Sequence, residues 1–113
     1  MAETLFTKIL NKQIPASFVY EDELCFAIND VNPQAPVHVL VIPKRPLDRL
    51  SNAQIEDQAL LGHLLLAVGK ITRLLKIEDA FRLVVNNGAE AGQSVFHLHL
   101  HVLAGRAFHW PPG

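Results

Sequence analysis

Residues 93–105 read QSVFHLHLHVLAG and place three histidines at every second position. His97, His99 and His101 alternate with apolar residues. Side chains two positions apart in a strand lie on one face, so the pattern predicts a strand over 95–103 with the imidazoles on one side and apolar groups on the other. The chain has six histidines, and half of them fall within this short run. Such a concentration indicates a functional site.

Metal binding is the first chemistry to consider for this histidine run, because an H-x-H pair on a strand can bind zinc. In an extended strand, however, His97 and His101 would lie roughly 13 Å apart, from a rise of ~3.3 Å per residue. That separation is too large for both to share one ion with His99 through Zn–N bonds of ~2.1 Å, so we expect no metal there. A sheet face that carries histidines without chemistry is a weaker interpretation, because histidine is a modest strand former.

Nucleophilic catalysis is the interpretation that fits the pattern best. Neutral imidazole is a good nucleophile near pH 7, because its unperturbed pKa is ~6.5. The loop GAEAGQS at 88–94 can direct backbone N–H groups toward phosphate oxygens. His38 lies inside the apolar run VHVLVI at 37–42, and a neighbouring strand would bring it to the cluster. Together these features predict a pocket in which a histidine attacks a phosphoryl group.

Length and composition predict one globular domain over 1–113, with 50% hydrophobic and 19% charged residues. A net charge of −1 argues against binding of a nucleic-acid polymer, which requires a basic face. Cys25 is the single cysteine, so neither an intrachain disulfide nor a cysteine-based metal cage is possible. The most apolar run, at 59–69, is shorter than the ~20 residues of a membrane span and contains His63. We expect no secretory signal, no membrane contact and a cytoplasmic location.

The spacing of apolar residues predicts two helices and five strands. In chain order these are a helix over 4–12, strands over 17–22, 24–29 and 37–42, a helix over 51–75, and strands over 80–85 and 95–103. Ser51 and Gln54 match an S-x-x-Q capping box at the start of the long helix. This order predicts an α+β domain in which an antiparallel five-stranded sheet has both helices on one face.

The same residues resemble the histidine triad (HIT) family, in particular the nucleotide-binding branch that hydrolyses nucleoside phosphoramidates. HLHLHVL at 97–103 matches the pattern His-φ-His-φ-His-φ-φ, where φ is apolar. Further matches are DVNPQAPVHVLVIPK, VVNNG, GQSVFHLHLHVLAG and the closing HWPPG, so the resemblance covers essentially the whole chain. His101 argues against the nucleotidyl transferases, which typically have Gln there, and WPPG favours the phosphoramidases over the dinucleoside polyphosphate hydrolases.

The resemblance implies a HIT-like fold, one sheet that continues across a homodimer, and no cofactor or metal. It implies hydrolysis of the P–N bond of purine nucleoside 5′-phosphoramidates, with release of a nucleoside monophosphate and an amine. His99, the middle histidine, would be the nucleophile and carry a covalent nucleotidyl group. His97 and His101 would flank and orient it, His38 would extend their hydrogen bonds, and Ser94 would bond the leaving amine or a phosphate oxygen.

The resemblance also implies which residues bind the nucleotide. Asp30 would accept hydrogen bonds from the ribose hydroxyls, and Val31 would lie against the sugar and base. The phosphate and leaving-group side would be formed by Asn86, Gly92, Gln93 and Ser94, together with His99 and His101. Ile28 and Asn29 stand where animal members have Phe and His, so we expect the strength of purine preference to differ.

Two positions outside the histidine motif, Pro46 and Trp110, carry further implications of the resemblance. Pro46 stands where many relatives have a histidine after the PK pair, which removes one outlying metal candidate. In the family the C-terminal tail approaches the partner's site, which would bring Trp110 there.

Three alternatives to the phosphoramidase function stay open: a nucleotide-binding module for protein interaction, a metal-dependent hydrolase, and a dinucleoside polyphosphate hydrolase.

Several candidate residues also have ordinary structural interpretations. Asp30 alone would be typical of a turn before a proline-containing loop. We expect Cys25 to be a small buried hydrophobe and His63 to lie on a helix surface. No function is predicted for His63 or His109.

Overall fold

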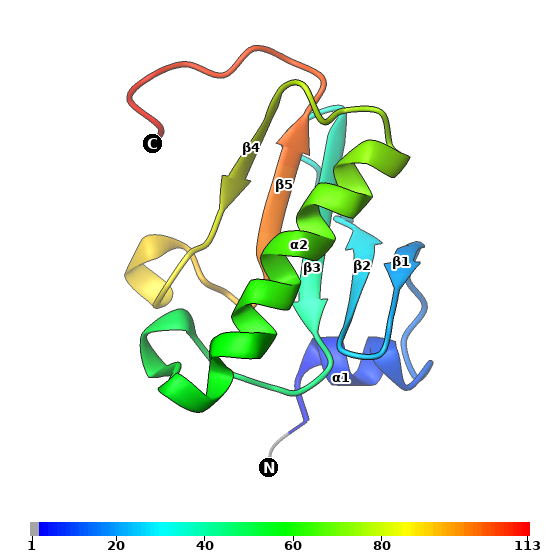
Figure 1. The fold of residues 1–113 in the computed structure, drawn as a ribbon, viewed down its shortest axis with the longest axis vertical. Helices are drawn as coiled ribbons and strands as arrows, with labels where there is room; N and C mark the ends of the chain where they lie inside the picture. Colours follow the sequence, from blue (N-terminus) through cyan, green and yellow to red (C-terminus); the bar gives the residue numbers. More distant parts are fainter. Residues whose placement is uncertain (1–2) are drawn as a thin grey trace.

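The structure is a computed structural model that describes residues 3–113 (Figure 1). Its helices and strands are α1 (Leu5–Leu10), β1 (Phe18–Glu21), β2 (Cys25–Asn29), β3 (Val37–Pro43), α2 (Gln58–Leu74), β4 (Phe81–Val84) and β5 (Leu100–Ala104). Short 3-10 turns occupy Leu50–Asn52, Ile55–Asp57 and Ala89–Ala91. Within the described residues, no helix combines the length and the apolarity that crossing a membrane requires.

The five strands form one antiparallel sheet in the order β1-β2-β3-β5-β4. β1 and β2 form an antiparallel hairpin, and β5 lies between β3 and β4. In the register of β3 and β5, Leu40 lies opposite His101 and His38 lies opposite Leu103. The predicted five-stranded antiparallel sheet with two helices is confirmed, and its histidine-bearing strand lies inside the sheet rather than at an edge.

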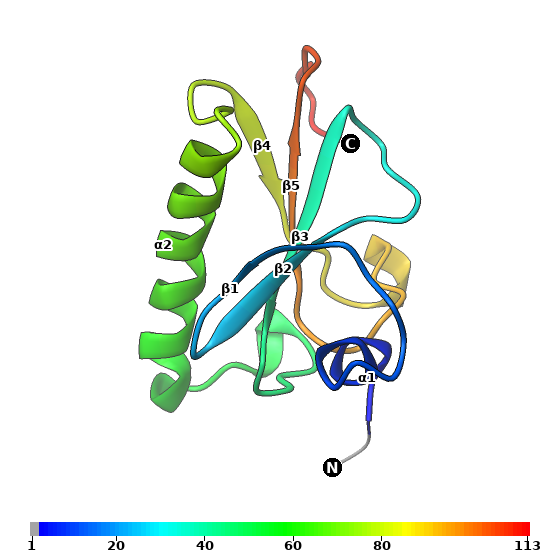
Figure 2. The same cartoon turned by 90° about the vertical axis from the view of Figure 1, so that its right-hand side faces the viewer.

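The two helices lie on opposite faces of the sheet (Figure 2), so the prediction of both on one face is wrong. Leu64, Val68 and Ile71 of α2 form a core with side chains from β2, β3 and β5. On the other face, Phe6 and Ile9 of α1 pack against further residues of β2 and β3. The cause is that β2 and β3 are buried at consecutive positions, so both of their faces need cover from water.

α2 begins at Gln58 rather than at the predicted Ser51, after two 3-10 turns. The carboxylate of Asp57 accepts the backbone N–H of Gln54 at 2.8 Å, so the bond near the helix start joins these two residues. The predicted capping box is wrong, because Ser51 donates its backbone N–H to the side chain of Asn87 in another loop. A long-range contact therefore replaces the local cap that the sequence indicates.

β5 begins at Leu100, so the predicted histidine strand starts too early. Continuing the register of β3 and β5 would place Leu98 opposite Pro43, which has no N–H to donate to a ladder. The Pro43 carbonyl instead bonds to the ring of His97, and the N–H of Leu98 donates to the carbonyl of Leu47. The side chains of this segment still alternate between the two faces of the sheet, as predicted.

Candidate active site

A cleft of about 220 Å³ opens between α1, the end of β2 and the histidine segment. Its lining consists of Leu5, Phe6, Ile9, Ile28, Asn29, Asp30, Val31, Leu40, Ser94, Val95, His99 and His101. Seven residues predicted from the sequence are therefore brought together here: Ile28, Asn29, Asp30, Val31, Ser94, His99 and His101. The other predicted residues lie outside the lining, namely His38, His97, Asn86, Gly92 and Gln93.

His99 has the ring geometry of a nucleophile. Its Nδ1 lies 2.7 Å from the carbonyl oxygen of His97, so Nδ1 carries the proton and donates it. In the neutral ring the lone pair is then on Nε2. Phe6 packs edge-on against the imidazole, with 5.0 Å between the ring centres, and restricts its orientation. A fixed tautomer with an unprotonated Nε2 is what nucleophilic attack by imidazole requires.

His97 lies behind the cleft and supports it. Its ring is fully buried, and Nε2 donates to the carbonyl of Pro43 at 2.7 Å. Nδ1 is then an acceptor, and the Thr4 hydroxyl donates to it at 2.7 Å. The same hydroxyl accepts the backbone N–H of Thr7 and caps α1. His97 thus links the start of α1 to the end of β3, while its own carbonyl holds His99.

His38 fixes the tautomer of His101 through a chain of hydrogen bonds. The backbone N–H of Gln34 donates to Nδ1 of His38 at 3.0 Å, which leaves the proton of His38 on Nε2. Nε2 of His38 donates to Nδ1 of His101 at 2.9 Å. An Asp30 carboxylate oxygen lies 3.4 Å from Nε2 of His38. His101 therefore carries its proton on Nε2. The rings of His99 and His101 are adjacent, 5.0 Å between centres, and present a lone pair and a hydrogen-bond donor respectively.

Burial keeps all three histidines of the run neutral at pH 7. It lowers the pKa of His97 and His99 below the ordinary value, although the carbonyls that accept from these rings oppose the shift. Burial also lowers the pKa of His101, and repulsion from His99 and His38 lowers it further, to about 4. The hydrogen bonds assign one ring proton to each histidine, which requires a neutral ring. The lowered pKa values therefore agree with this assignment.

Asp30 follows β2 and uses its two carboxylate oxygens differently. One accepts the backbone N–H of Asn32 at 2.8 Å, which is the turn interaction that its sequence context indicates. The other faces the pair of bonded histidines. The Asn29 side chain donates to the hydroxyl of Ser17 at 2.9 Å, beside the cleft. Val31 is 98% exposed, so its contact with a sugar or base stays a prediction.

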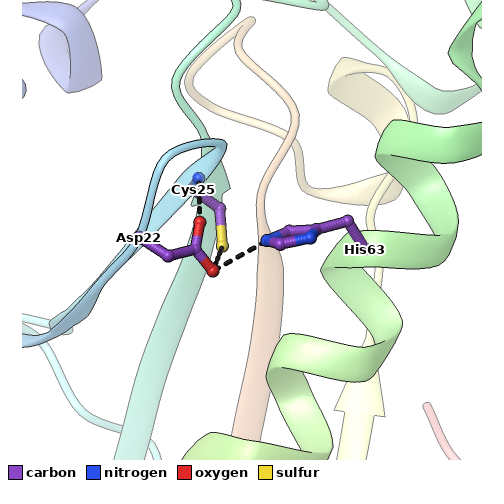
Figure 3. Close-up of side chains that lie close together, drawn as sticks. All are labelled: Asp22, Cys25 and His63. Carbon is purple, nitrogen blue, oxygen red and sulfur yellow. Dashed lines mark hydrogen bonds and ion pairs between the residues drawn. The ribbon is translucent and has the colours of Figure 1, made fainter.

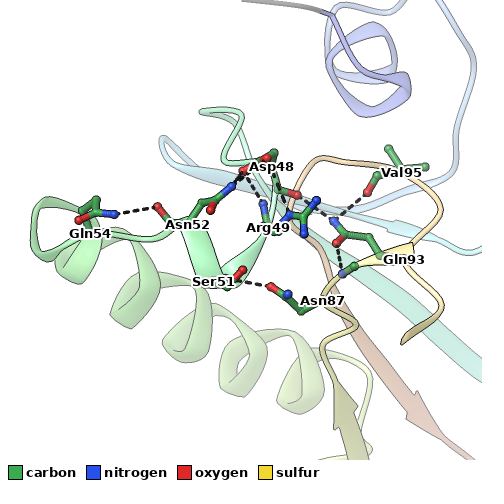
Figure 4. Close-up of polar contacts among 9 residues, drawn as sticks. Asp48, Arg49, Ser51, Asn52, Gln54, Asn87, Gln93 and Val95 are labelled. Carbon is green, nitrogen blue, oxygen red and sulfur yellow. Dashed lines mark hydrogen bonds and ion pairs between the residues drawn. The ribbon is translucent and has the colours of Figure 1, made fainter. Parts of the chain in front are cut away.

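The side chain of Gln93 is buried and bonds to backbone groups at both ends of the loop at 88–94 (Figure 4). Its side-chain nitrogen donates to the carbonyls of Asp48 at 2.8 Å and Val95 at 3.1 Å. Its side-chain oxygen accepts the backbone N–H of Gly88 at 2.8 Å. The buried amide of Gln93 is therefore committed to the protein, and its effect on a bound phosphate would be exerted through the shape of the loop.

The backbone of the same loop is also bonded internally. The N–H groups of Ala91, Gly92 and Gln93 donate to carbonyls within the loop. Gly92 has φ +99°, which favours glycine, and packs beside the side chain of Asn86. The predicted phosphate contacts of Asn86, Gly92 and Gln93 stay predictions, and Ser94 is the loop residue that lines the cleft.

The sequence reasoning missed the apolar wall of the cleft. The wall consists of Leu5, Phe6, Ile9, Leu40 and Val95. The apolar stripe of α1 was the available signal, but a stripe does not reveal which face of a sheet a helix covers. Thr4 was also missed as the partner of His97, although a threonine at a helix start is a recognisable capping signal.

Comparisons with known proteins cover the whole chain. The model of the HIT domain family matches residues 11–108. An uncharacterised HIT-like protein of Synechocystis sp. (strain PCC 6803) is 66% identical over 100% of both chains. The crystal structure of a HIT family hydrolase from Legionella pneumophila has a TM-score of 0.94 at 39% identity, and the match covers 98% of this chain and 100% of that one. The crystal structure of a histidine triad nucleotide-binding protein from Candida albicans has a TM-score of 0.82 at 30% identity, over 96% of this chain and 83% of that one.

Proposed function

Because this chain belongs to the HIT domain family, we propose that it is a nucleotide-binding hydrolase that cleaves the P–N bond of purine nucleoside 5′-phosphoramidates. The observation that carries the proposal is the pair of tautomers in the cleft, with a bare Nε2 on His99 and an Nε2–H on His101. One ring offers a lone pair to phosphorus, and the other offers a hydrogen bond to a phosphate oxygen. A hydrolase and a nucleotide-binding protein among the solved relatives support the same class.

In the first step, the Nε2 lone pair of His99 attacks the α-phosphorus and the P–N bond of the substrate breaks. The electron pair of that bond leaves with the amine, which takes up a proton from water. In this proposal Ser94, which lines the cleft, hydrogen-bonds the amine, while His101 donates to a phosphate oxygen. The His99 ring becomes positively charged and keeps its Nδ1–H on the carbonyl of His97, so the charge is stabilised without a further proton transfer.

In the second step, water attacks the phosphorus of the adduct and the bond to Nε2 of His99 breaks. The lone pair returns to Nε2, the water loses a proton to solvent, and nucleoside monophosphate leaves. Because Nδ1 keeps its proton throughout, the starting tautomer is restored. The covalent intermediate divides one difficult displacement into two easier ones.

Recognition of the nucleoside in this proposal uses the other walls of the cleft. The Asp30 carboxylate accepts hydrogen bonds from ribose hydroxyls, and the base packs on the apolar wall. Phe6 and Leu40 of that wall lie beside Ile28, so the base meets a continuous nonpolar surface near the end of β2. The aromatic ring of Phe6 suits the flat face of a purine.

Trapping the intermediate tests the proposal. The protein is mixed with adenosine 5′-phosphoramidate and quenched in denaturant at alkaline pH, where phosphohistidine bonds survive. We expect the intact mass to rise by one adenylyl group, located on the peptide that contains His99. The variant His99→Ala should show no adduct, whereas Gln58→Ala, at an exposed position of α2, should match the wild type. Tight binding of AMP with neither adduct nor turnover would overturn the proposal and support a binding module.

A metal-dependent hydrolase is favoured by one observation. Asp30, His38 and His101 place three donor atoms within 4.8 Å of one another. However, the facing nitrogens of the two histidines already bond to each other at 2.9 Å. Turnover in excess chelator separates the two mechanisms, because the covalent mechanism keeps its rate there and a metal-dependent one loses it.

We also propose that the chain forms a homodimer in which one sheet continues through both copies. β4 is an edge strand whose outer side pairs with no other described strand. Near it lies an apolar hollow lined by Leu50, Leu61, Leu64, Leu65, Val85, Leu98 and Leu100. On α2, Leu65 is 58% exposed and Leu66 is 72% exposed. A second copy would cover both the unpaired edge and these leucines, and would meet the exposed Trp110 of the tail.

A further inference from the structure

Three side chains with metal-binding atoms converge on the face of the sheet that α2 covers (Figure 3). Asp22 lies in the turn between β1 and β2, Cys25 begins β2, and His63 comes from α2. Cys25 is buried as expected, but His63 is not a plain surface residue, because it bonds to Asp22 across the gap between helix and hairpin. The candidate active site lies on the other face of the sheet, so its chemistry does not involve this cluster.

The donor atoms of the cluster are spaced nearly as one small ion requires. Nε2 of His63 lies 2.7 Å from a carboxylate oxygen of Asp22, and Sγ of Cys25 lies 3.6 Å from the same oxygen. All three donor atoms lie within 4.8 Å of one another. In a tetrahedral zinc site with bonds of ~2.0–2.3 Å, ligand atoms are roughly 3.3–3.7 Å apart. Small side-chain rotations would place the three atoms around one ion.

The order of hydrogen bonds argues against a nucleophilic thiol at this place. In a cysteine–histidine nucleophile, the histidine lies beside the thiol and takes its proton. Here the Asp22 carboxylate lies in the middle, and both Cys25 and His63 donate to it. The cluster is suited to holding a cation rather than to attacking a substrate.

Asp22 is held in position by groups outside the donor set. One carboxylate oxygen accepts the backbone N–H groups of Leu24 and Cys25 at 2.8 and 2.9 Å. The other accepts the Tyr20 hydroxyl at 2.8 Å. The ring of His63 donates to this second oxygen as well. The cluster therefore contains a carboxylate ligand whose orientation is fixed.

The surrounding charges act in two directions. Lys44 and Lys70 lie near Cys25, and their positive charges would repel a cation. Lys44 is already paired with Glu21 at 2.9 Å, which reduces that repulsion. Two anionic ligands, a thiolate and a carboxylate, would neutralise a divalent ion, so the balance favours binding.

We propose that Asp22, Cys25 and His63 bind Zn²⁺ or a similar thiophilic divalent cation, with water as the fourth ligand. Binding releases the thiol proton to solvent, and His63 ligates through Nε2 while its proton resides on Nδ1. The side chains of His63 and Asp22 are 31% and 21% exposed, so water can reach the fourth position. The bound ion ties the β1–β2 hairpin to α2 and stabilises the fold.

Cobalt titration of the purified protein tests this site, because Co²⁺ replaces zinc and its bond to a thiolate produces an intense charge-transfer band in the near ultraviolet. Cys25 is the chain's single cysteine, so the band reports on this site alone. We expect the band to saturate at one equivalent and to disappear when Zn²⁺ is added. Cys25→Ser should abolish it, and His63→Ala should weaken the affinity by about tenfold or more.

His109→Ala, in the exposed tail, is the matched control and should bind Co²⁺ as the wild type does. Circular dichroism establishes that each variant is folded. Zn²⁺ should also raise the melting temperature of the wild type and not that of His63→Ala, which keeps the test valid if Cys25→Ser does not fold. A complete wild-type titration without the charge-transfer band, or an unchanged affinity in His63→Ala, would overturn the proposal.

Discussion

Backbone groups decide the protonation pattern of the candidate site. The carbonyl of His97 holds the proton of His99 on Nδ1, and the N–H of Gln34 places the proton of His38 on Nε2. From His38 the pattern passes to His101 through the bond of 2.9 Å between their rings. Two identical side chains thus present a lone pair and a hydrogen-bond donor to the cleft, because the ring of His99 bonds to a backbone carbonyl and the ring of His101 bonds to that of His38.

The pH dependence of turnover tests the neutral state of His99. Burial lowers the pKa of this ring, so it stays unprotonated and nucleophilic at pH values where an exposed histidine is already charged. We expect the acidic limb of kcat/KM for adenosine 5′-phosphoramidate to lie below ~6.5, the ordinary value for histidine. A limb at or above that value, after correction for titration of the substrate, would contradict this assignment.

Thr4 offers a test of the support behind the cleft. Thr4→Val removes the hydroxyl that donates to His97 and caps α1, so we expect a loss of about 1–3 kcal/mol in the free energy of unfolding. Thr4→Ser keeps the hydroxyl and should stay close to the wild type. Urea denaturation measures both variants. Equal stability of Thr4→Val and the wild type would show that this hydrogen bond does not support the fold.

The sequence predicts the four histidines of the site but not their tautomers. The alternation of histidines with apolar residues identifies His97, His99 and His101 as candidates, and the apolar run around His38 suggests a neighbouring strand. Two of the bonds that set the protons join residues distant in the chain: the Pro43 carbonyl with the ring of His97, and the ring of His38 with that of His101. No local pattern encodes such contacts, because they depend on how β3 and the histidine segment meet.

At the scale of elements, the loop before the histidine segment depends on Gln93. Gln93→Ala removes three hydrogen bonds and leaves the N–H of Gly88 without its partner, so we expect a loss of about 1–3 kcal/mol in the free energy of unfolding. Turnover should fall as well, because Ser94 is adjacent. Gln58→Ala, at an exposed position of α2, is the control and should change little. Wild-type stability and turnover in Gln93→Ala would contradict this role.

Element boundaries show where sequence patterns stop being sufficient. The alternation predicts which faces the side chains of the histidine segment occupy, whereas the start of β5 is set by the missing N–H of Pro43 on the neighbouring strand. In the same way, Ser51 has the sequence of a helix cap but donates to Asn87 instead. In both cases a distant partner decides the outcome.

At the scale of the molecule, apolar strands covered on both faces separate two regions of chemistry. The cleft lies on the α1 face, and the Asp22–Cys25–His63 cluster lies on the α2 face. The consecutive apolar residues of β2 and β3 indicate that both faces of the sheet are covered, and they do so more directly than the order of elements does.

The proposed homodimer is tested by light scattering coupled to gel filtration. The wild type should elute with the mass of two chains, because a second copy covers the apolar hollow and the free edge of β4. Leu65→Glu places a charge in that hollow and should shift the protein to monomers. Lys8→Glu, on α1 at the opposite face, should remain dimeric. A monomeric wild type at micromolar concentration would contradict the proposal.

The most direct measurement of the central claim is steady-state turnover of adenosine 5′-phosphoramidate in the presence of excess chelator. The account predicts that the wild type and Gln58→Ala turn over at equal rates, because this exposed residue of α2 does not line the cleft. It predicts that folded His99→Ala is slower by roughly 10³-fold or more, because the Nε2 lone pair that attacks phosphorus is gone. Turnover by His99→Ala at a rate near that of the wild type would contradict the account.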